Sequence, residues 1–154
     1  MTAQGPGLVD PTLVRSVRDW VAAWGDEVAG VELERARQRF ASDVVAFGTH
    51  ADVVAGLDHL YDEQWGQVWP TIEGFTFRVD DLVVLASPDG RQAVAVVGWD
   101  SIGIADDGSR FDRPGRATIV LHREDPASPW QGVHTHFSLG RGVPSTSYGT
   151  RPRR

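Results

Sequence analysis

The sequence predicts a single α+β domain in which helices cover one face of a curved antiparallel sheet. Apolar residues recur at helical spacing in the first part of the chain, as far as Pro70. From Phe75 onward they alternate with polar residues, which is the period of a strand. Helices that come first and consecutive strands that come afterwards are typical of the α+β class.

Three helices are expected before the strands. Asp10 and Pro11 form a good helix start, because aspartate caps a helix and proline is favoured at its first position. The apolar residues of this first helix are Leu13, Val14, Val17, Trp20, Val21, Trp24 and Val28. A short second helix is expected over about 31–41, ended by Ser42 and Asp43.

A third helix is expected between Gly56 and Pro70. Its inner side gathers large side chains, namely Leu57, Leu60, Tyr61, Trp65, Val68 and Trp69. A short strand is expected over 44–47, before this helix. Four longer strands are expected after it, over 75–85, 92–104, 115–124 and 130–139.

Length and composition limit the classes of function. A chain of 154 residues can bury a real core, and we expect one domain over 10–141 with loose tails at 1–9 and 142–154. The formal net charge of −6 argues against nucleic acid and anionic membranes as partners. The sequence has no cysteine, which excludes thiol chemistry. It has no long apolar run and no signal-like start, so we expect a cytoplasmic protein.

The register of the last two predicted strands decides where the histidines point. The turn-rich segment 125–129 suggests that Glu124 faces Trp130 across a hairpin. One face then pairs Leu121 with Val133, Ile119 with Thr135, and Ala117 with Phe137. The other face pairs Val120 with His134, Thr118 with His136, and Arg116 with Ser138, with His122 diagonal to His134.

Only the first of these faces is apolar enough to meet the helices. We therefore expect His134 and His136 on the outer side of the sheet, although a β-bulge would reverse part of this register. That outer face mixes apolar and polar side chains, which suits a subunit interface. Its predicted interface residues are Asp100, Arg116, Thr118 and His122. Asp100 and Arg116 are expected to form a salt bridge across adjacent strands, with a catalytic pair as the alternative.

Four stretches carry a family resemblance: GDEVAGVELERARQRFASDVVAFGT, AGLDHL, GRATIVLHRED and VHTHFS. Together they resemble the SnoaL-like branch of the nuclear-transport-factor-2-like superfamily and the related association domain of calcium/calmodulin-dependent kinase II. The resemblance covers about residues 10–141. It implies a cone, in which three N-terminal helices close over a strongly curved antiparallel sheet, and dimerisation through the outer face of that sheet. Some members are isomerases, dehydratases, cyclases or epoxide hydrolases, and others only bind or assemble.

The resemblance also shows which family side chains are missing. Ketosteroid isomerases of this fold use an aspartate base where this chain has Phe47 and Gly48, and their second acid falls on Ile119. The pocket arginines of the association domain fall on apolar residues, namely Trp99, Ile119 and Phe137. The chain therefore resembles the isomerases in shape and not in chemistry.

Aromatic residues instead predict an apolar pocket. Large rings in a small cone favour a shaped cavity for a cyclic small molecule, with sparse polar handles. The predicted ligand-binding residues are Trp20, Trp24, Leu60, Trp65, Trp69, Trp99, Ser101, Ile119, Thr135 and Phe137. The alternative is a core of packed rings in a protein that only assembles.

Three histidines are the candidates for catalysis, should the protein be an isomerase, dehydratase or cyclase. His50, in a loop at the cone mouth, is the first candidate base within the cavity, followed by His134 and His136. Alternate strand residues lie about 7 Å apart on one face, which would also suit a metal, but we favour a hydrogen-bonded interface role. The sequence thus predicts a homodimer that binds a small molecule, with no metal and no cofactor, and leaves open whether it is an enzyme.

Overall fold

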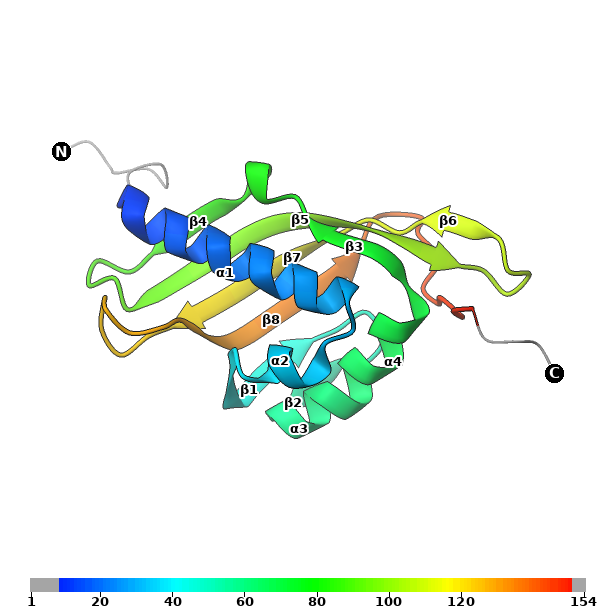
Figure 1. Cartoon of the computed structure of the whole chain (residues 1–154), viewed down its shortest axis with the longest axis horizontal. Coiled ribbons are helices and arrows are strands. Elements are labelled where there is room, and N and C mark those ends of the chain that lie inside the picture. Colours follow the sequence, from blue (N-terminus) through cyan, green and yellow to red (C-terminus); the bar gives the residue numbers. More distant parts are fainter. Residues whose placement is uncertain (1–8, 151–154) are drawn as a thin grey trace.

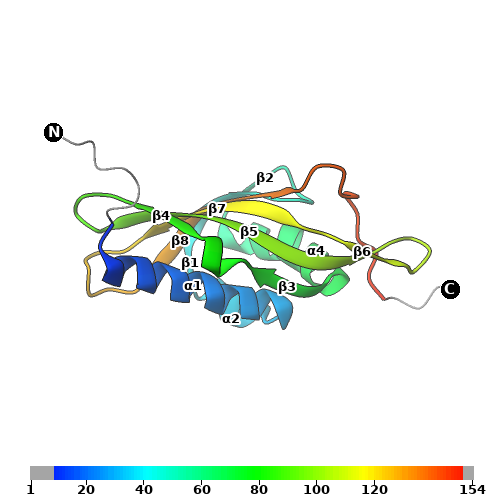
Figure 2. The ribbon, with the colours of Figure 1, turned by 90° about the horizontal axis from the view of Figure 1, so that it is seen from above.

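The structure, a computed structural model, describes residues 9–150 and shows helices packed against one face of a curved sheet (Figures 1 and 2). The sheet has eight strands in the order β2-β1-β8-β7-β5-β3, with β4 and β6 also paired to β5. The strands are β1 Phe40–Phe47, β2 Val53–Ala55, β3 Glu73–Phe77, β4 Val83–Ala86, β5 Gln92–Ile104, β6 Arg110–Asp112, β7 Gly115–His122 and β8 Gln131–Leu139. The segments 1–8 and 151–154 of the two predicted tails lie outside the described residues.

The sheet is mixed, which corrects the expectation of a fully antiparallel one. β1 runs parallel to β8, with Val45 opposite His134 and Phe47 opposite His136, whereas the other pairings are antiparallel. The reason is that β1 and β8 are far apart in the sequence. A short turn does not connect them, so no hairpin imposes the antiparallel direction.

Helix α1, Pro11–Ala29, forms as its sequence predicts and crosses the concave face of the sheet (Figure 1). The Asp10 carboxylate accepts a hydrogen bond from the backbone N–H of Thr12 at 2.9 Å, as a capping residue does. The predicted apolar side of α1 is buried except for Val14, which is half-buried. Within residues 9–150, no helix has the length and apolar character that a membrane crossing requires.

The second helix is shorter than predicted. Helix α2 covers only Leu33–Arg37, and β1 begins at Phe40, so Ser42 and Asp43 lie inside a strand instead of ending a helix. Both are exposed, while Phe40 and Val44 are buried beneath the helices. Pairing with β8 therefore overrides the helical spacing of the segment, as tertiary contacts often override local propensity.

The third predicted helix is present but irregular. It consists of α3 Leu57–Leu60, a π-helical turn over Tyr61–Trp65, α4 Gly66–Val68 and a 3₁₀ turn over Trp69–Thr71. Its inner side chains are buried or half-buried as expected. The predicted strand over 75–85 is likewise divided, because a 3₁₀ turn at Val79–Asp81 separates β3 from β4, and both strands pair with β5.

The last hairpin keeps the predicted register over most of its length. Ile119 pairs with Thr135 and Val120 with His134, but a β-bulge then shifts the pairing, so Leu121 faces Gly132 and not Val133. Gly132, at this bulge, leaves room for Phe40, because a Cβ there would lie 2.4 Å from an atom of the Phe40 ring. The predicted outward direction of the histidines is unaffected, since the bulge lies beyond them.

Trp24 of α1 forms the centre of the core. It is 1% exposed, and its ring lies 4.9 Å from that of Phe40 and 6.3 Å from that of Trp65, measured between centroids. The aromatic rings that it contacts are Trp20, Phe40, Trp65, Phe77 and Phe137. These rings come from α1, the third helical segment and three strands, so one side chain ties the helices to the sheet.

A buried ion pair joins the end of α1 to the start of β1. The Arg39 Nε atom donates to both carboxylate oxygens of Glu27, at 2.8 and 2.7 Å, and the Glu27 side chain is 3% exposed. An isolated buried carboxylate is costly, so Arg39 is needed to make the burial of Glu27 tolerable.

We predict that Arg39→Met destabilises the fold by about 3 kcal/mol, because it leaves the Glu27 charge buried and unpaired. The double variant Glu27→Leu/Arg39→Met should recover most of this loss. Arg35→Met removes an exposed ion pair with Glu32 and serves as the matched control, with little expected effect. Urea unfolding measures all three, and equal stabilities for the single and double variants would contradict the role of the pair.

Candidate functional site

A small cavity lies between the helices and the concave face of the sheet, a space we call the cone interior. Its volume is about 30 Å³, and on this measure a single water molecule needs roughly 10–15 Å³. It is lined by Trp24, Ala46, Phe47, Gly48, Leu60, Gln64, Trp65, Thr135 and Phe137. Sites for drug-sized ligands are roughly ten to thirty times larger. A ring-sized molecule can therefore enter only if lining side chains move apart.

The predicted ligand-binding residues all lie inside the molecule, but they divide into two groups. Those that line the cavity are Trp24, Leu60, Trp65, Thr135 and Phe137. The others are buried in the surrounding core, namely Trp20, Trp69, Trp99, Ser101 and Ile119. Their role in ligand binding stays a prediction, although the placement of Trp99, Ile119 and Phe137 on the concave face agrees with the expected alternation.

Two indole N–H groups of this interior lack an acceptor. Nε1 of Trp24 and Nε1 of Trp99 are buried and have no hydrogen-bond partner among the described residues. Two other indole N–H groups are paired. That of Trp20 donates to the backbone carbonyl of Trp130 at 3.2 Å, and that of Trp130 donates to the Ser16 hydroxyl at 2.9 Å. Buried donors are paired in the great majority of cases, so these two mark a place where an acceptor would be stabilised.

The candidate catalytic histidines do not line this cavity, although two of them contact Phe47, which does. Nδ1 of His134 is 2.7 Å from the Val45 carbonyl oxygen, and the rings of His134 and His136 both meet Phe47 edge-on. The His50 side chain is exposed. Its backbone N–H donates a hydrogen bond to the side-chain oxygen of Gln64. Within residues 9–150 the lining of the cavity includes none of the three. The same residues contain no group of three or more His, Asp or Glu side chains that could hold a metal ion.

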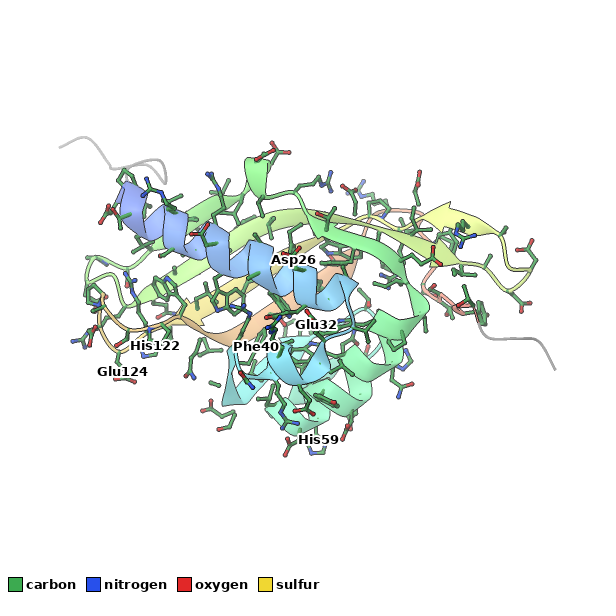
Figure 3. All side chains as sticks on the ribbon, viewed as in Figure 1. Asp26, Glu32, Phe40, His59, His122 and Glu124 are labelled. Atoms are coloured by element: carbon green, nitrogen blue, oxygen red, sulfur yellow. The ribbon has the colours of Figure 1, made fainter. Side chains whose placement is uncertain are left out.

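His122 is also exposed, and Figure 3 shows it with Glu124 at one end of the sheet, far from His59 on α3. The bulge places His122 opposite Gln131 in the hairpin. His122 is therefore at the edge of the outer face.

The predicted salt bridge between Asp100 and Arg116 does not form. β7 begins at Gly115, opposite Trp99, so Asp100 lies just beyond the end of that strand. The Asp100 carboxylate instead lies 3.6 Å from Nε of Arg78, and Arg116 donates to the Ser138 hydroxyl at 3.1 Å. The sequence could not show this, because Arg78 reaches Asp100 only after β3 has paired with β5.

Gln64 is a site residue that the sequence pattern missed. Its side-chain oxygen accepts hydrogen bonds from the backbone N–H groups of His50 and Ala51, at 3.1 and 2.8 Å. Its amide nitrogen donates to the Thr49 hydroxyl at 3.1 Å. Gly48 makes this approach possible, since a Cβ there would lie 2.3 Å from the Gln64 oxygen. The π-helical turn thus holds the loop between β1 and β2 at the rim of the cavity.

Arg113, between β6 and β7, is the second residue that was missed. It is 3% exposed, yet it forms no ion pair with any described carboxylate. One Nη atom donates to the Thr49 hydroxyl at 3.3 Å, the guanidinium lies 5.4 Å from the centroid of the Trp99 ring, and Nε has no partner. Burial lowers the pKa of Arg113 to about 10. In the sequence it looks like part of a solvated loop, so nothing local predicts its burial.

Comparisons with known proteins agree with this architecture. The family model of the SnoaL-like domain matches residues 17–142. A comparison with functionally curated proteins finds no match. A nuclear transport factor 2-like superfamily protein from Salmonella enterica serovar Typhimurium has a TM-score of 0.69 at 18% identity, over 85% of this chain and 96% of that one.

Two further solved structures have the same fold. A ketosteroid isomerase-like protein from Erwinia carotovora has a TM-score of 0.70 at 11% identity, over 84% of this chain and 98% of that one. The CaMKII hub from S. rosetta has a TM-score of 0.66 at 19% identity, over 86% of this chain and 98% of that one. At such identities the likeness shows a shared fold and not a shared activity.

We predict that Gln64→Leu loosens the loop over residues 48–51, because three hydrogen bonds to that loop are lost. Hydrogen exchange at the amides of His50 and Ala51 should speed up by about tenfold. Gln67→Leu, on the exposed side of the same helical segment, is the matched control. Unchanged protection of both amides in the Gln64 variant would contradict this role.

Proposed function

Because this chain belongs to the SnoaL-like domain family, whose shared fold hosts many functions, we propose that it is a homodimer that binds a mostly apolar, cyclic small molecule in the cone interior. One observation carries the ligand proposal, namely the unpartnered indole N–H groups of Trp24 and Trp99 among packed aromatic rings. A ring with a carbonyl or hydroxyl oxygen would match both the apolar wall and the unmet donors.

Binding requires the cone interior to open, because the cavity holds only about 30 Å³. Two lining residues lie on the π-helical turn, Gln64 and Trp65, and a third, Phe137, is only half-buried. π-helical turns are rare and occur frequently at functional sites. A shift of this turn would enlarge the cavity. Because only molecules with the open cavity could bind, the apparent affinity would equal the affinity of the open form multiplied by the fraction of molecules that are open.

The alternative is an isomerase, dehydratase or cyclase that uses histidine acid–base catalysis. It would need a histidine within hydrogen-bond reach of a molecule in the cone interior. The rings of His134 and His136 pack around Phe47 on the outer face, and the His50 side chain is exposed. Ligand binding without histidine chemistry is therefore the better-supported function.

The outer face of the sheet supports the homodimer. Strand pairing puts the most exposed large apolar side chains of the described strands on this one face, namely Val45, Phe47, Val53, Val83, Leu85 and Val96. The predicted interface residues Arg116 and Thr118 lie between them. Contiguous exposed apolar surface favours association, and a second copy of the same face is the simplest partner.

We predict that tryptophan fluorescence changes when the protein meets a suitable member of a panel of steroids, cyclic polyketides and terpenoids. Trp24→Phe keeps a ring but removes one unpartnered N–H, so it should weaken binding of the best compound about 3- to 10-fold. Trp130→Phe removes a fluorophore from outside the cavity and should leave affinity unchanged. A panel without any response would reject ligand binding and favour a protein that only assembles.

We predict that Val96→Asp converts the dimer to a monomer, because it buries a charge in the apolar outer face. Ala22→Asp adds the same charge on the exposed side of α1 and should leave the dimer intact. Sedimentation velocity distinguishes the two states. A wild-type protein that sediments as a monomer at micromolar concentration would contradict the homodimer.

A further inference from the structure

We infer that Arg113 is a binding position for a carboxylate, so that the ligand of the cone interior is a cyclic carboxylic acid in its ionised form. This inference rests on the proposed function, because the apolar part of such a molecule would occupy the aromatic interior. It adds the polar end of the ligand and the side chain that recognises it.

Arg113 differs from two other arginines that are buried or half-buried, Arg39 and Arg123, in what surrounds it. Arg39 is neutralised by Glu27, with two hydrogen bonds. Arg123 donates from Nε to the Gly90 carbonyl at 2.8 Å and stacks on Trp130 at 4.0 Å. Arg113 has neither a counter-charge nor an Nε partner among the described residues. A guanidinium carries five N–H donors, and the side chain of Arg113 uses one of them.

The position of Arg113 connects it to the cavity on two sides. On one side it lies over the ring of Trp99, whose own N–H is unpartnered and whose ring is 6.2 Å from that of Phe137 in the cavity wall. On the other side it donates to Thr49, which also receives the amide of Gln64, another wall residue. Two unmet donors, Arg113 Nε and Trp99 Nε1, therefore belong to neighbouring side chains.

The charge of Arg113 favours an anion over a neutral acceptor. Although burial lowers the pKa of Arg113 to about 10, the group is still protonated at pH 7. A buried cation without a counter-charge is unfavourable, and a carboxylate restores the balance through two parallel hydrogen bonds. A phosphate would bring more charge than one guanidinium neutralises into an apolar interior. The whole chain has a net charge of −6 and repels anions at long range. The attraction of a carboxylate must therefore come from Arg113 and its immediate surroundings.

By the same argument, burying the charged Arg113 side chain lowers the stability of the folded protein when no ligand is bound. The folded-state pKa is lowered, so the unfolded chain holds this proton more tightly, and the burial penalty is fully present below about pH 10 and fades above it. Arg113→Met keeps much of the side-chain volume and removes the charge. Its midpoint of thermal unfolding without ligand should therefore equal or exceed that of the wild type.

The test compares 2-naphthoate with 2-naphthamide, which have the same ring system but differ in charge, by tryptophan fluorescence at pH 7.5. The wild type should bind the carboxylate about 10- to 100-fold more tightly than the amide, as expected for hydrogen bonds to a charged group. Arg113→Met should bind both compounds with the affinity of the amide. Arg110→Met removes an exposed arginine three residues away and should keep the preference.

The outcomes separate the two proposals. Equal binding of both compounds by the wild type, or a preference that survives in Arg113→Met, would overturn the carboxylate site and leave the ligand pocket standing. Binding of neither compound would overturn both for this ligand class. The wild-type comparison stays decisive even if the variant fails to fold, and a 2-naphthoate-induced rise in the unfolding midpoint of the wild type but not of Arg113→Met would support the site.

Discussion

The packing of Trp24 against the concave face of the sheet is the contact on which the rest of the structure depends. Its ring meets aromatic side chains from α1, β1, β3, β8 and the third helical segment, so it sets the distance between the helices and the sheet. Trp24 also lines the cavity, and its N–H has no partner in the part of the chain that the structure describes. The core and the candidate site are therefore made of the same side chains, and any change that opens one loosens the other.

Three polar groups of this interior have no hydrogen-bond partner among the described residues. Trp24, Trp99 and Arg113 each keep a buried donor without an acceptor, whereas most of the surrounding polar groups are paired. Buried polar groups in native proteins are paired with protein groups, water or a ligand in the great majority of cases, so these three donors are where a further partner is expected. The polar cluster of Thr49, Gln64 and Arg113 is where the apolar interior meets the loop at its rim. The outer face of the sheet, by contrast, carries exposed apolar side chains such as Val53, Val83 and Val96 beside polar ones, so the two faces differ in their chemistry.

Sequence reasoning worked where one element determines its own pattern. The burial of α1 follows from its apolar spacing, and the length of β5 matches the predicted segment 92–104. It failed where a distant partner decides. The segment 31–41 has helical spacing, but pairing with β8 turns its end into β1. The sequence predicted a salt bridge between Asp100 and Arg116. Because β7 begins at Gly115, Asp100 instead pairs with Arg78. Around the cavity, the sequence pattern named Trp24, Trp65 and Phe137, which line it, but it did not name Gln64. It did not name Arg113 either, because the burial of Arg113 depends on distant segments.

By itself, the sequence determined the α+β class, the capped first helix, and the opposite directions of Phe137 and its neighbouring histidines, because helical and strand periods are properties of a few consecutive residues. Only the tertiary structure decided the parallel pairing of β1 with β8, the β-bulge at the last hairpin and the burial of Arg113. Those features arise between segments far apart in the chain. A charged residue in a loop becomes buried only when Trp99 and Thr49, from separate elements, close around it.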